Sequence, residues 1–298
     1  MNPLEKNSCD YLVDTHTHGK EFGPSTSLSD YKELVKKEKW NGRDALFVSD
    51  HGEIIPEPDW NRLQDWVHDI GLFPFSPILV LPGAEISTCV IKKSKGFSLE
   101  AKPTSTSKDY VLSIHVGVIA SEYEQISKLT TYLSQFKKPV PLSEVLIAIS
   151  DNNAVGIINH PKTPNKPNWE TRKIAILYIK DQDQDQGSAI RALEVTSGNY
   201  ADSNGEIAEL AKTCELTTTG GSDAHVGKNG WEADIQRSAT VIKVAPNEVL
   251  LPSDIVRLIG EDGTAEKNNR NRRVYPVSLT RIYKQSLWER FALRFIKL

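Results

Sequence analysis

Six of the seven histidines stand at the ends of short apolar runs. They are His16, His18, His51, His115, His160 and His225. Two acidic residues, Glu85 and Asp223, end such runs as well, whereas His68 falls within a pattern typical of a helix. Imidazoles and carboxylates without cysteine suit zinc, manganese or iron(II), and this set exceeds the about four to six positions of one ion. We therefore expect two or three divalent cations to bind these residues.

The spacing of two pairs supports this interpretation. His16 and His18 are two residues apart, as are Asp223 and His225. Side chains at positions i and i+2 of an extended segment point the same way, so each pair can face one site. The two glycines at 220–221 leave room where a side chain would crowd the ions.

Seven apolar, β-branched runs are expected to be strands. They cover 11–16, 45–51, 78–85, 111–115, 155–160, 192–197 and 216–223. Continuous runs of this kind are typical of the parallel strands of a sheet buried on both faces. Helical patterns lie between several of them, the first after the candidate N-cap Ser27. This alternation predicts an α/β barrel, in which the carboxyl ends of all strands would bring the histidines to one face.

Two segments interrupt the alternation. Residues from about 89 to 109 are rich in Lys, Pro, Thr and Ser, which predicts an insertion on the surface, with a hairpin as one form of it. The sequence DQDQDQ at 181–186 lies between a helix and a strand, and its composition predicts a solvated loop.

Seven short motifs resemble the polymerase and histidinol phosphatase (PHP) superfamily of metal-dependent phosphoesterases. In order they are VDTHTH, FVSDHGE, GAEIS, SIHVGVI, GIINHP, LEVTSGN and TGGSDAHVG, within residues 13–227. The resemblance continues more weakly to about residue 273. It implies a distorted (β/α)7 TIM-like barrel with a centre of two or three metal ions.

The resemblance also implies which residues bind each ion. Those of the first ion are His16, His18, Glu85 and Asp223. Those of the second are Glu85, as a bridging carboxylate, His115 and His160. His51 and His225 would bind a third ion, which family members complete with an Asp or His soon after the HxH pair; here Glu21 is the substitute. Asp50 is expected to accept a hydrogen bond from an imidazole.

Two adjacent cations acidify a bridging water and bind the oxygens of an in-line phosphoryl displacement. We expect hydroxide attack on a small phosphomonoester, such as a nucleotide or phosphorylated metabolite, with Glu85 and Asp223 as catalytic carboxylates of the centre. Lys162 and Lys228 follow the histidines in loops and are candidates to bind the phosphate. Hydrolysis of carboxamides, carbamates or lactones at the same centre is the alternative, and no residue excludes it.

The chain has 298 residues, of which 39% are hydrophobic, so a barrel of about 250 residues fits as one domain. We expect the barrel to span 1–273, with a basic amphipathic helix at 274–298. The lack of a long apolar stretch and of a leader peptide predicts a cytoplasmic protein. The three cysteines, Cys9, Cys89 and Cys214, are scattered, which argues against disulfides or a thiolate zinc site.

The net charge of −3 conceals an uneven distribution, because nine Lys and Arg but one acidic residue follow position 266. Apolar residues at helical spacing from Leu279 to Leu298 predict that the tail is amphipathic. Its apolar face would pack on the barrel. Alternatively, residues 270–298 would contact a nucleic acid, an anionic membrane or a protein partner, and the barrel would then be an accessory module.

Overall fold

The computed structural model describes residues 9–19, 26–52, 54–71, 78–93, 96–99, 110–162, 169–184, 188–197, 200–201, 205–226, 238–244, 250–261 and 272–275. Glu21, Lys228 and residues 276–298 of the expected C-terminal helix lie outside this part of the chain. Within it, no helix has both the length and the apolar character that a membrane span requires.

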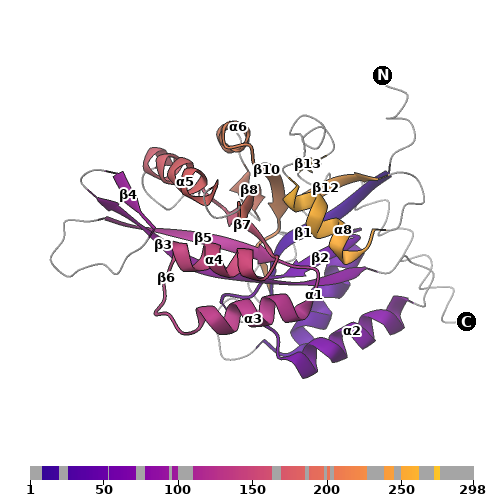
Figure 1. Ribbon diagram of the computed structural model, residues 1–298. Helices are drawn as coiled ribbons and strands as arrows, with labels where there is room; N and C mark the ends of the chain where they lie inside the picture. Colours follow the sequence, from indigo (N-terminus) through magenta and orange to yellow (C-terminus); the bar gives the residue numbers. More distant parts are fainter. Residues whose placement is uncertain are drawn as a thin grey trace, which may run out of the picture.

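The described elements alternate along the chain (Figure 1). The helices are α1 (Leu28–Trp40), α2 (Glu57–Gly71), α3 (Tyr123–Leu133), α4 (Leu142–Asp151), α5 (Trp169–Gln184), α6 (Glu206–Thr213) and α8 (Pro252–Gly260). The longer strands are β1 (Cys9–His18), β2 (Ala45–Val48), β3 (Leu79–Lys93), β5 (Tyr110–Ile119), β7 (Val155–Asn159), β8 (Ile190–Ser197), β10 (Thr217–Gly221), β12 (Ala239–Val244) and β13 (Arg272–Tyr275). The short ones are β4 (Gly96–Ser98), β6 (Val140–Pro141), β9 (Tyr200–Ala201) and β11 (Ala224–His225).

The strands form one mixed sheet that is nearly closed into a barrel. Their order is β10-β8-β7-β5-β3-β2-β1-β12-β13. All seven runs expected to be strands are strands, and the α/β barrel is confirmed. The expectation that all strands are parallel is wrong, because β5 is antiparallel to β3 and β7, and β12 is antiparallel to β1 and β13. The barrel also has an eighth strand, β12, beyond the seven expected ones.

The two ends of the strand order, β10 and β13, lie next to each other, and β10 also lies against β1 and β12. The Gly220 amide donates a hydrogen bond to Oγ1 of Thr240 at 2.8 Å, and the Thr15 hydroxyl donates to the Gly220 carbonyl at 3.2 Å. The short strand β11 pairs in parallel with the end of β1, from Thr17 to His18. The described part of the barrel is therefore closed by a few contacts rather than by a long ladder of strand hydrogen bonds.

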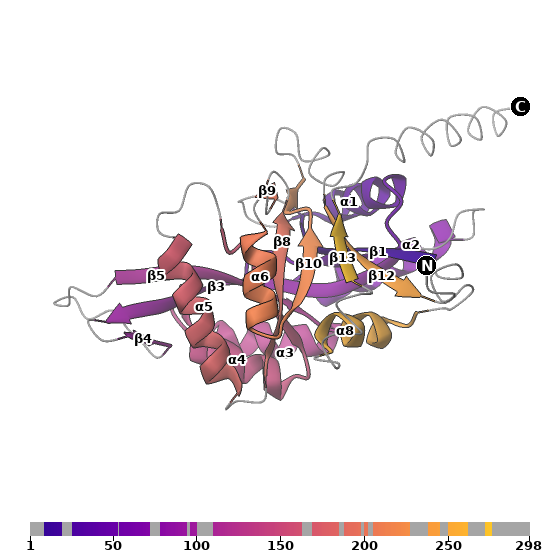
Figure 2. The same ribbon diagram turned by 90° about the horizontal axis from the view of Figure 1, so that it is seen from above.

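A long hairpin of β3 and β5 extends beyond the barrel and carries β4 on one edge (Figure 2). The expected insertion begins within this hairpin, because Cys89–Lys93 continue β3. Its expected surface exposure is wrong for Cys89, Val90, Ile91 and Leu99, which are buried. These apolar side chains are buried in the fold, although the lysine-rich and serine-rich sequence around them predicts exposure.

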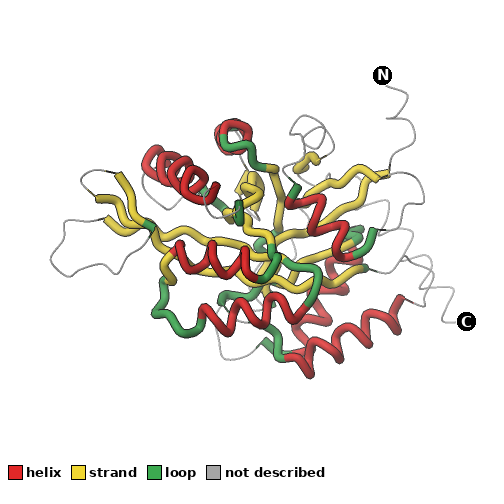
Figure 3. The backbone as a smooth tube through the Cα atoms, viewed as in Figure 1, coloured by secondary structure: helices red, strands yellow, loops and turns green. Residues whose placement is uncertain are grey.

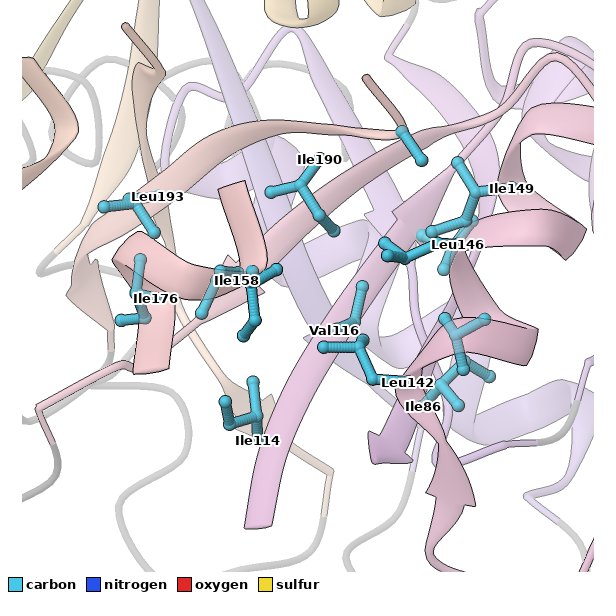
Figure 4. Packing of buried hydrophobic residues seen from close by; sticks show 14 of the residues in the cluster. Ile86, Ile114, Val116, Leu142, Leu146, Ile149, Ile158, Ile176, Ile190 and Leu193 are labelled. Atoms are coloured by element: carbon cyan, nitrogen blue, oxygen red, sulfur yellow. The ribbon is translucent and has the colours of Figure 1, made fainter. Parts of the chain in front are cut away.

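Helices pack on the outside of the sheet (Figures 1 and 3). Leu142 and Leu146 of α4 point toward Ile86 and Val116 of β3 and β5 (Figure 4), whereas Ile149 lies against Gly156 of β7. Each fully buried side chain of this kind contributes about 1.5–3 kcal/mol to folding. These contacts fix β3 and β5, the two strands that carry Glu85 and His115.

Local signals explain where two helices begin and end. Ser27 caps α1 as expected, because its hydroxyl accepts the Asp30 amide and its own amide donates to the Asp30 carboxylate. At the end of α5 the expected solvated loop is wrong for residues 181–184, which are helical. Asp183 is fully buried and accepts the amides of Ala189 and Ile190, so it fixes the entry to β8.

Candidate metal centre

The barrel brings eight of the predicted ligands to one rim. They form four overlapping groups, His16–His18–Glu85, Glu85–His115–His160, His16–His160–Asp223 and His18–His51–His225. In each group the possible ligand atoms lie within 4.8 Å of one another. Several buried His, Glu and Asp clusters could therefore bind metal ions, as the residue types indicated.

Glu85 lies at the centre of these groups and is fully buried. Its Oε1 atom is 3.0 Å from Nε2 of His160, 3.2 Å from Nδ1 of His115 and 3.3 Å from Nε2 of His16. Its Oε2 atom is 2.8 Å from Nδ1 of His51 and 3.7 Å from Nε2 of His18. The two oxygens of one carboxylate thus face two different sets of imidazoles.

His16 and His18 meet on the same side of β1, as their spacing predicted. Their Nε2 atoms are 2.9 Å apart. Oδ1 of Asp223 lies 3.4 Å from Nε2 of His18 and 3.7 Å from Nε2 of His16. Asp223 reaches them from a backbone in the left-handed region, with φ 51°, a conformation that costs about 1–3 kcal/mol when no glycine is present. The Asp223 side chain is 32% exposed, so this acid is open to solvent while Glu85 is not.

His51 and His225 form the other end of the cluster. Their Nε2 atoms are 3.3 Å apart, and the His18 ring stacks between them at 4.3 Å from each. Nδ1 of His225 lies 2.9 Å from the carbonyl oxygen of Asp223, so Nδ1 donates and Nε2 keeps its lone pair. The structure groups His18 with His51 and His225 as well as with His16 and Glu85, and the second group is the one that the family resemblance implies.

His115 reaches the rim by a different route from the expected one. Because β5 is antiparallel to its neighbours, His115 lies in the middle of this strand and not at its carboxyl end. Glu85 likewise lies within β3, because β3 continues past the rim into the hairpin. Both residues still lie beside the other candidate ligands. Glu85 of β3 pairs with Gly117 of β5, and His115 of β5 pairs with Asn159, which directly precedes His160.

Two polar residues that the motif analysis did not single out orient the ligands. Glu194 of β8 is 1% exposed; its Oε1 lies 3.1 Å from Nδ1 of His16, and its Oε2 accepts the His160 amide at 2.7 Å. Asn159 donates from Nδ2 to Oε1 of Glu85 at 3.1 Å. The available signals were an acid inside the apolar run at 192–197 and an amide directly before His160.

The backbone around His16 is held by Asp14 and Gly221. Oδ1 of the fully buried Asp14 accepts the amides of His16 and Ser222, which ties β1 to the segment before Asp223. A Cβ atom on Gly221 would lie 2.3 Å from Cβ of His16 and 2.6 Å from Oε1 of Glu194. The glycine makes room as expected, but for His16 and Glu194 and not for the ions themselves.

The ionisable residues of the cluster differ in charge, because their pKa values shift in different directions. Burial lowers the pKa of His18 to about 3, so this imidazole is neutral. Burial also lowers the pKa of His16, but Glu194, Glu85 and Asp223 together outweigh it and raise this pKa well above the usual range. Burial alone would raise the pKa of Glu85, yet His16, His115 and His160 hold it well below its ordinary value. Glu85 is therefore ionised, and a positive charge on His16 is stabilised beside it.

Two buried polar atoms indicate whether the cluster suits divalent cations. Oε2 of Glu85 and Nδ1 of His18 have no hydrogen bond within the described residues, although His51 lies close to the former. A buried polar atom without a partner costs about 1–3 kcal/mol, and more when charged. A cation beside Glu85 would remove that cost for the carboxylate. The donor set and the buried carboxylate oxygen fit divalent cations.

The other predicted residues lie as follows. Lys162 pairs with Glu206 and its Nζ lies 5.5 Å from the centre of the Trp169 ring. Asp50 accepts hydrogen bonds from the Gly19 amide and the Tyr31 hydroxyl, so it holds the chain directly after β1, and its expected hydrogen bond from an imidazole stays a prediction. His68 is exposed on α2, as expected for a residue outside the cluster. Cys89 and Cys214 are buried free thiols.

The fold and the site define an α/β barrel with His-rich clusters that could bind metal ions, which is what the PHP resemblance implies. No protein-family model matches this chain, and no curated protein matches it by sequence.

Three solved structures are similar to it. PsfC from Pseudomonas syringae is 18% identical, with a TM-score of 0.49 over 96% of this chain and 99% of that one. An amidohydrolase from Chromobacterium violaceum, with sulfate and no metal, is 11% identical, with a TM-score of 0.41 over 73% and 88%. Endonuclease Q, in complex with a duplex that has an abasic lesion at the active site, is 14% identical, with a TM-score of 0.49 over 85% and 56%.

Proposed function

We propose that this chain is a metal-dependent phosphoesterase of the PHP type that hydrolyses small phosphomonoesters. The observation that carries the proposal is the position of Glu85. This buried carboxylate faces His16, His115 and His160 with one oxygen and His18 and His51 with the other. A carboxylate between two sets of imidazoles suits a bridging ligand of two cations.

The proposed ligands follow the four groups. His16, Glu85 and Asp223 would bind one cation with His18, and Glu85 would share a second with His115 and His160. His51 and His225 would bind a third cation, completed by Glu21. The cations proposed are zinc, manganese or iron(II).

When bound, the cations would acidify a water molecule and neutralise the charge that develops on the phosphoryl oxygens. The side chains of this chain supply the remaining functions. Glu85 is inaccessible to solvent and orients imidazoles on both sides, whereas Asp223 is 32% exposed and ionised, because His16 and His18 outweigh the effect of burial on its pKa. We assign to Asp223 the acceptance of the proton from the attacking water.

Lys162 would bind the phosphate of the substrate. It follows His160 by two residues and is partly buried, with Glu206 as its partner. A phosphate dianion would have to replace Glu206, which is 42% exposed and free to turn toward solvent. The segment 270–298 would contact a nucleic acid, an anionic membrane or a protein; its residues 272–275 form β13 on the edge of the sheet.

The test is an assay of the protein loaded with manganese or zinc against phosphomonoesters, phosphodiesters, carboxamides and lactones. Hydrolysis of phosphomonoesters that disappears with chelator and returns with added metal supports the proposal. Turnover of carboxamides or lactones alone contradicts the phosphoesterase assignment but retains the metal centre, because both reactions use the same activated water. Elemental analysis of protein purified without chelator identifies the cation and its stoichiometry.

A further inference from the structure

A cavity of about 550 Å³ opens beside the metal-binding cluster. His51 and His115 form part of its wall, and the opposite side is formed by the segment from the end of α3 to β6. This volume falls in the range of about 300–1,000 Å³ that is typical of pockets for small molecules. A ligand in the cavity would therefore touch two of the proposed cation-binding imidazoles.

The cavity has one cationic side chain, Lys138. Its Nζ lies 2.9 Å from the point where a Cβ atom on Gly52 would stand, so it lies against the backbone next to His51. Gly52 has φ +64°, and its amide donates to the Glu85 carbonyl at 2.7 Å, which fixes this turn beside the cluster.

Lys138 differs from Lys162 in its partners. Lys162 is paired with Glu206, whereas no acidic partner of Lys138 is found in the described part of the chain. An ammonium group at the edge of a cavity and close to a centre for divalent cations suits an anionic ligand.

The remaining wall is largely apolar, with Ser87 and Ser134 as its polar side chains. Phe136 is partly exposed in the cavity, and Tyr132 packs edge-on against it at 5.4 Å between ring centres. The buried side chains of Ile86 and Leu133 continue this wall. A heavily hydroxylated group would lose hydrogen bonds to water here without replacing most of them, whereas an apolar group would not.

We propose that this cavity is the substrate pocket, in which Lys138 binds a phosphoryl oxygen and Phe136 packs against an apolar, ring-sized organic group. The assignment deepens the proposed function and rests on it. It makes the preferred substrates phosphomonoesters of phenols or other apolar alcohols.

The test is direct binding of phenylphosphonate and methylphosphonate, which are not hydrolysed, to the manganese-loaded protein by calorimetry. Wild-type protein is expected to bind phenylphosphonate more tightly. Lys138→Ala is expected to weaken both anions about tenfold, because a hydrogen bond to a charged group is lost. Phe136→Ala is expected to weaken phenylphosphonate alone. Lys137→Ala is the control, since this neighbouring lysine is exposed like Lys138 but does not line the cavity.

The proposal is overturned if Lys138→Ala binds both anions like wild type, if Lys137→Ala weakens them as much, or if wild type binds neither. Equal loss of both anions in Phe136→Ala overturns the apolar assignment. Phe136→Leu is a second variant that retains most of the packing on Tyr132. Turnover of phenyl phosphate and of a phenyl carboxamide by the same proteins tests the proposed function separately, because anion binding requires no hydrolysis.

Discussion

The Nδ1 atom of His16 lies 3.1 Å from Oε1 of Glu194, and the second oxygen of Glu194 accepts the His160 amide. A carboxylate oxygen accepts hydrogen bonds, so Nδ1 of His16 donates to Glu194 and its Nε2 faces Glu85 and His18. One buried acid thereby sets the orientation of two strand-end residues that are 144 positions apart in the sequence.

Glu194→Gln is expected to lower the affinity for divalent cations about 10- to 100-fold, because the amide no longer fixes the His16 imidazole through a charged acceptor. Titration of chelator-treated protein with manganese measures this affinity. Glu209→Gln, an exposed position on α6, is the matched control. Unchanged affinity in Glu194→Gln would exclude an orienting role for Glu194.

Glu85→Gln is expected to remove more bound metal than His115→Ala. Glu85 belongs to two of the four ligand groups, whereas His115 belongs to one. Elemental analysis of the purified variants should show a loss of at least two cations for Glu85→Gln and of one for His115→Ala. Equal metal content in the two variants would contradict the bridging position.

Gly221→Ala is expected to destabilise the fold by about 1–3 kcal/mol through crowding, because its Cβ would lie 2.3 Å from Cβ of His16. Gly205→Ala is the comparison, since Gly205 has φ +69° and no atom near its Cβ position, so only the backbone conformation is unfavourable there. Urea unfolding with chelator present measures stability, and manganese titration should show weaker binding for Gly221→Ala alone. A normal manganese affinity in Gly221→Ala would show that the site tolerates a methyl group at this position.

Acid is expected to destabilise the chelator-treated protein. The pKa of His18 is about 3 in the fold against 6.5 in an unfolded chain, so between these values the unfolded state binds the extra proton. Stability attributable to His18 therefore falls as pH decreases through this window, by about 1.4 kcal/mol per pH unit. His16 has the opposite sign: its raised pKa adds stability below 6.5 that is lost as pH rises through the folded value. Urea unfolding from pH 4.5 to 8 measures stability on both sides of pH 6.5. His18→Asn should reduce the loss of stability in acid without abolishing it, because burial lowers the pKa of His225 too, and should leave the change above pH 6.5 in place.

Lys162→Ala is expected to raise the KM for phosphomonoesters several-fold with a smaller change in kcat, since a phosphate contact made before and during reaction is lost. Steady-state kinetics with manganese measures both constants. Glu206→Gln, which frees the lysine from its partner, should not raise KM. If Lys162→Ala leaves both constants unchanged, Lys162 has no part in binding phosphate.

The strands and the convergence of the candidate ligands could be predicted because both depend on local sequence. Continuous apolar runs identify buried strands, and imidazoles at their ends indicate a shared rim. The direction of a strand does not depend on local sequence. An apolar run such as 111–115 fits a parallel or an antiparallel strand equally well, so the sequence did not reveal that β5 is antiparallel to its neighbours. The strand Ala239–Val244 was missed, as it follows the last motif and contains polar residues.

The orienting residues could not be derived from spacing. Glu194 is a single acid in an apolar strand, and its role depends on His16 and His160, which other strands bring to it. Asp183 was assigned to a solvated loop because its neighbours are all polar. It is nevertheless fully buried, and its carboxylate accepts two amides at the start of β8. Both are buried acids whose partners are set by the tertiary fold.

The seam of the barrel between β1 and β10 has few hydrogen bonds, and the cluster spans it. His16 and His18 lie on one side, and Asp223 and His225 lie on the other. Under the proposed ligand assignments, bound cations would connect the two sides of the seam in the way that a covalent cross-link does. Ion affinity and barrel closure would then be thermodynamically linked, so that a change which loosens β10 weakens metal binding from a distance.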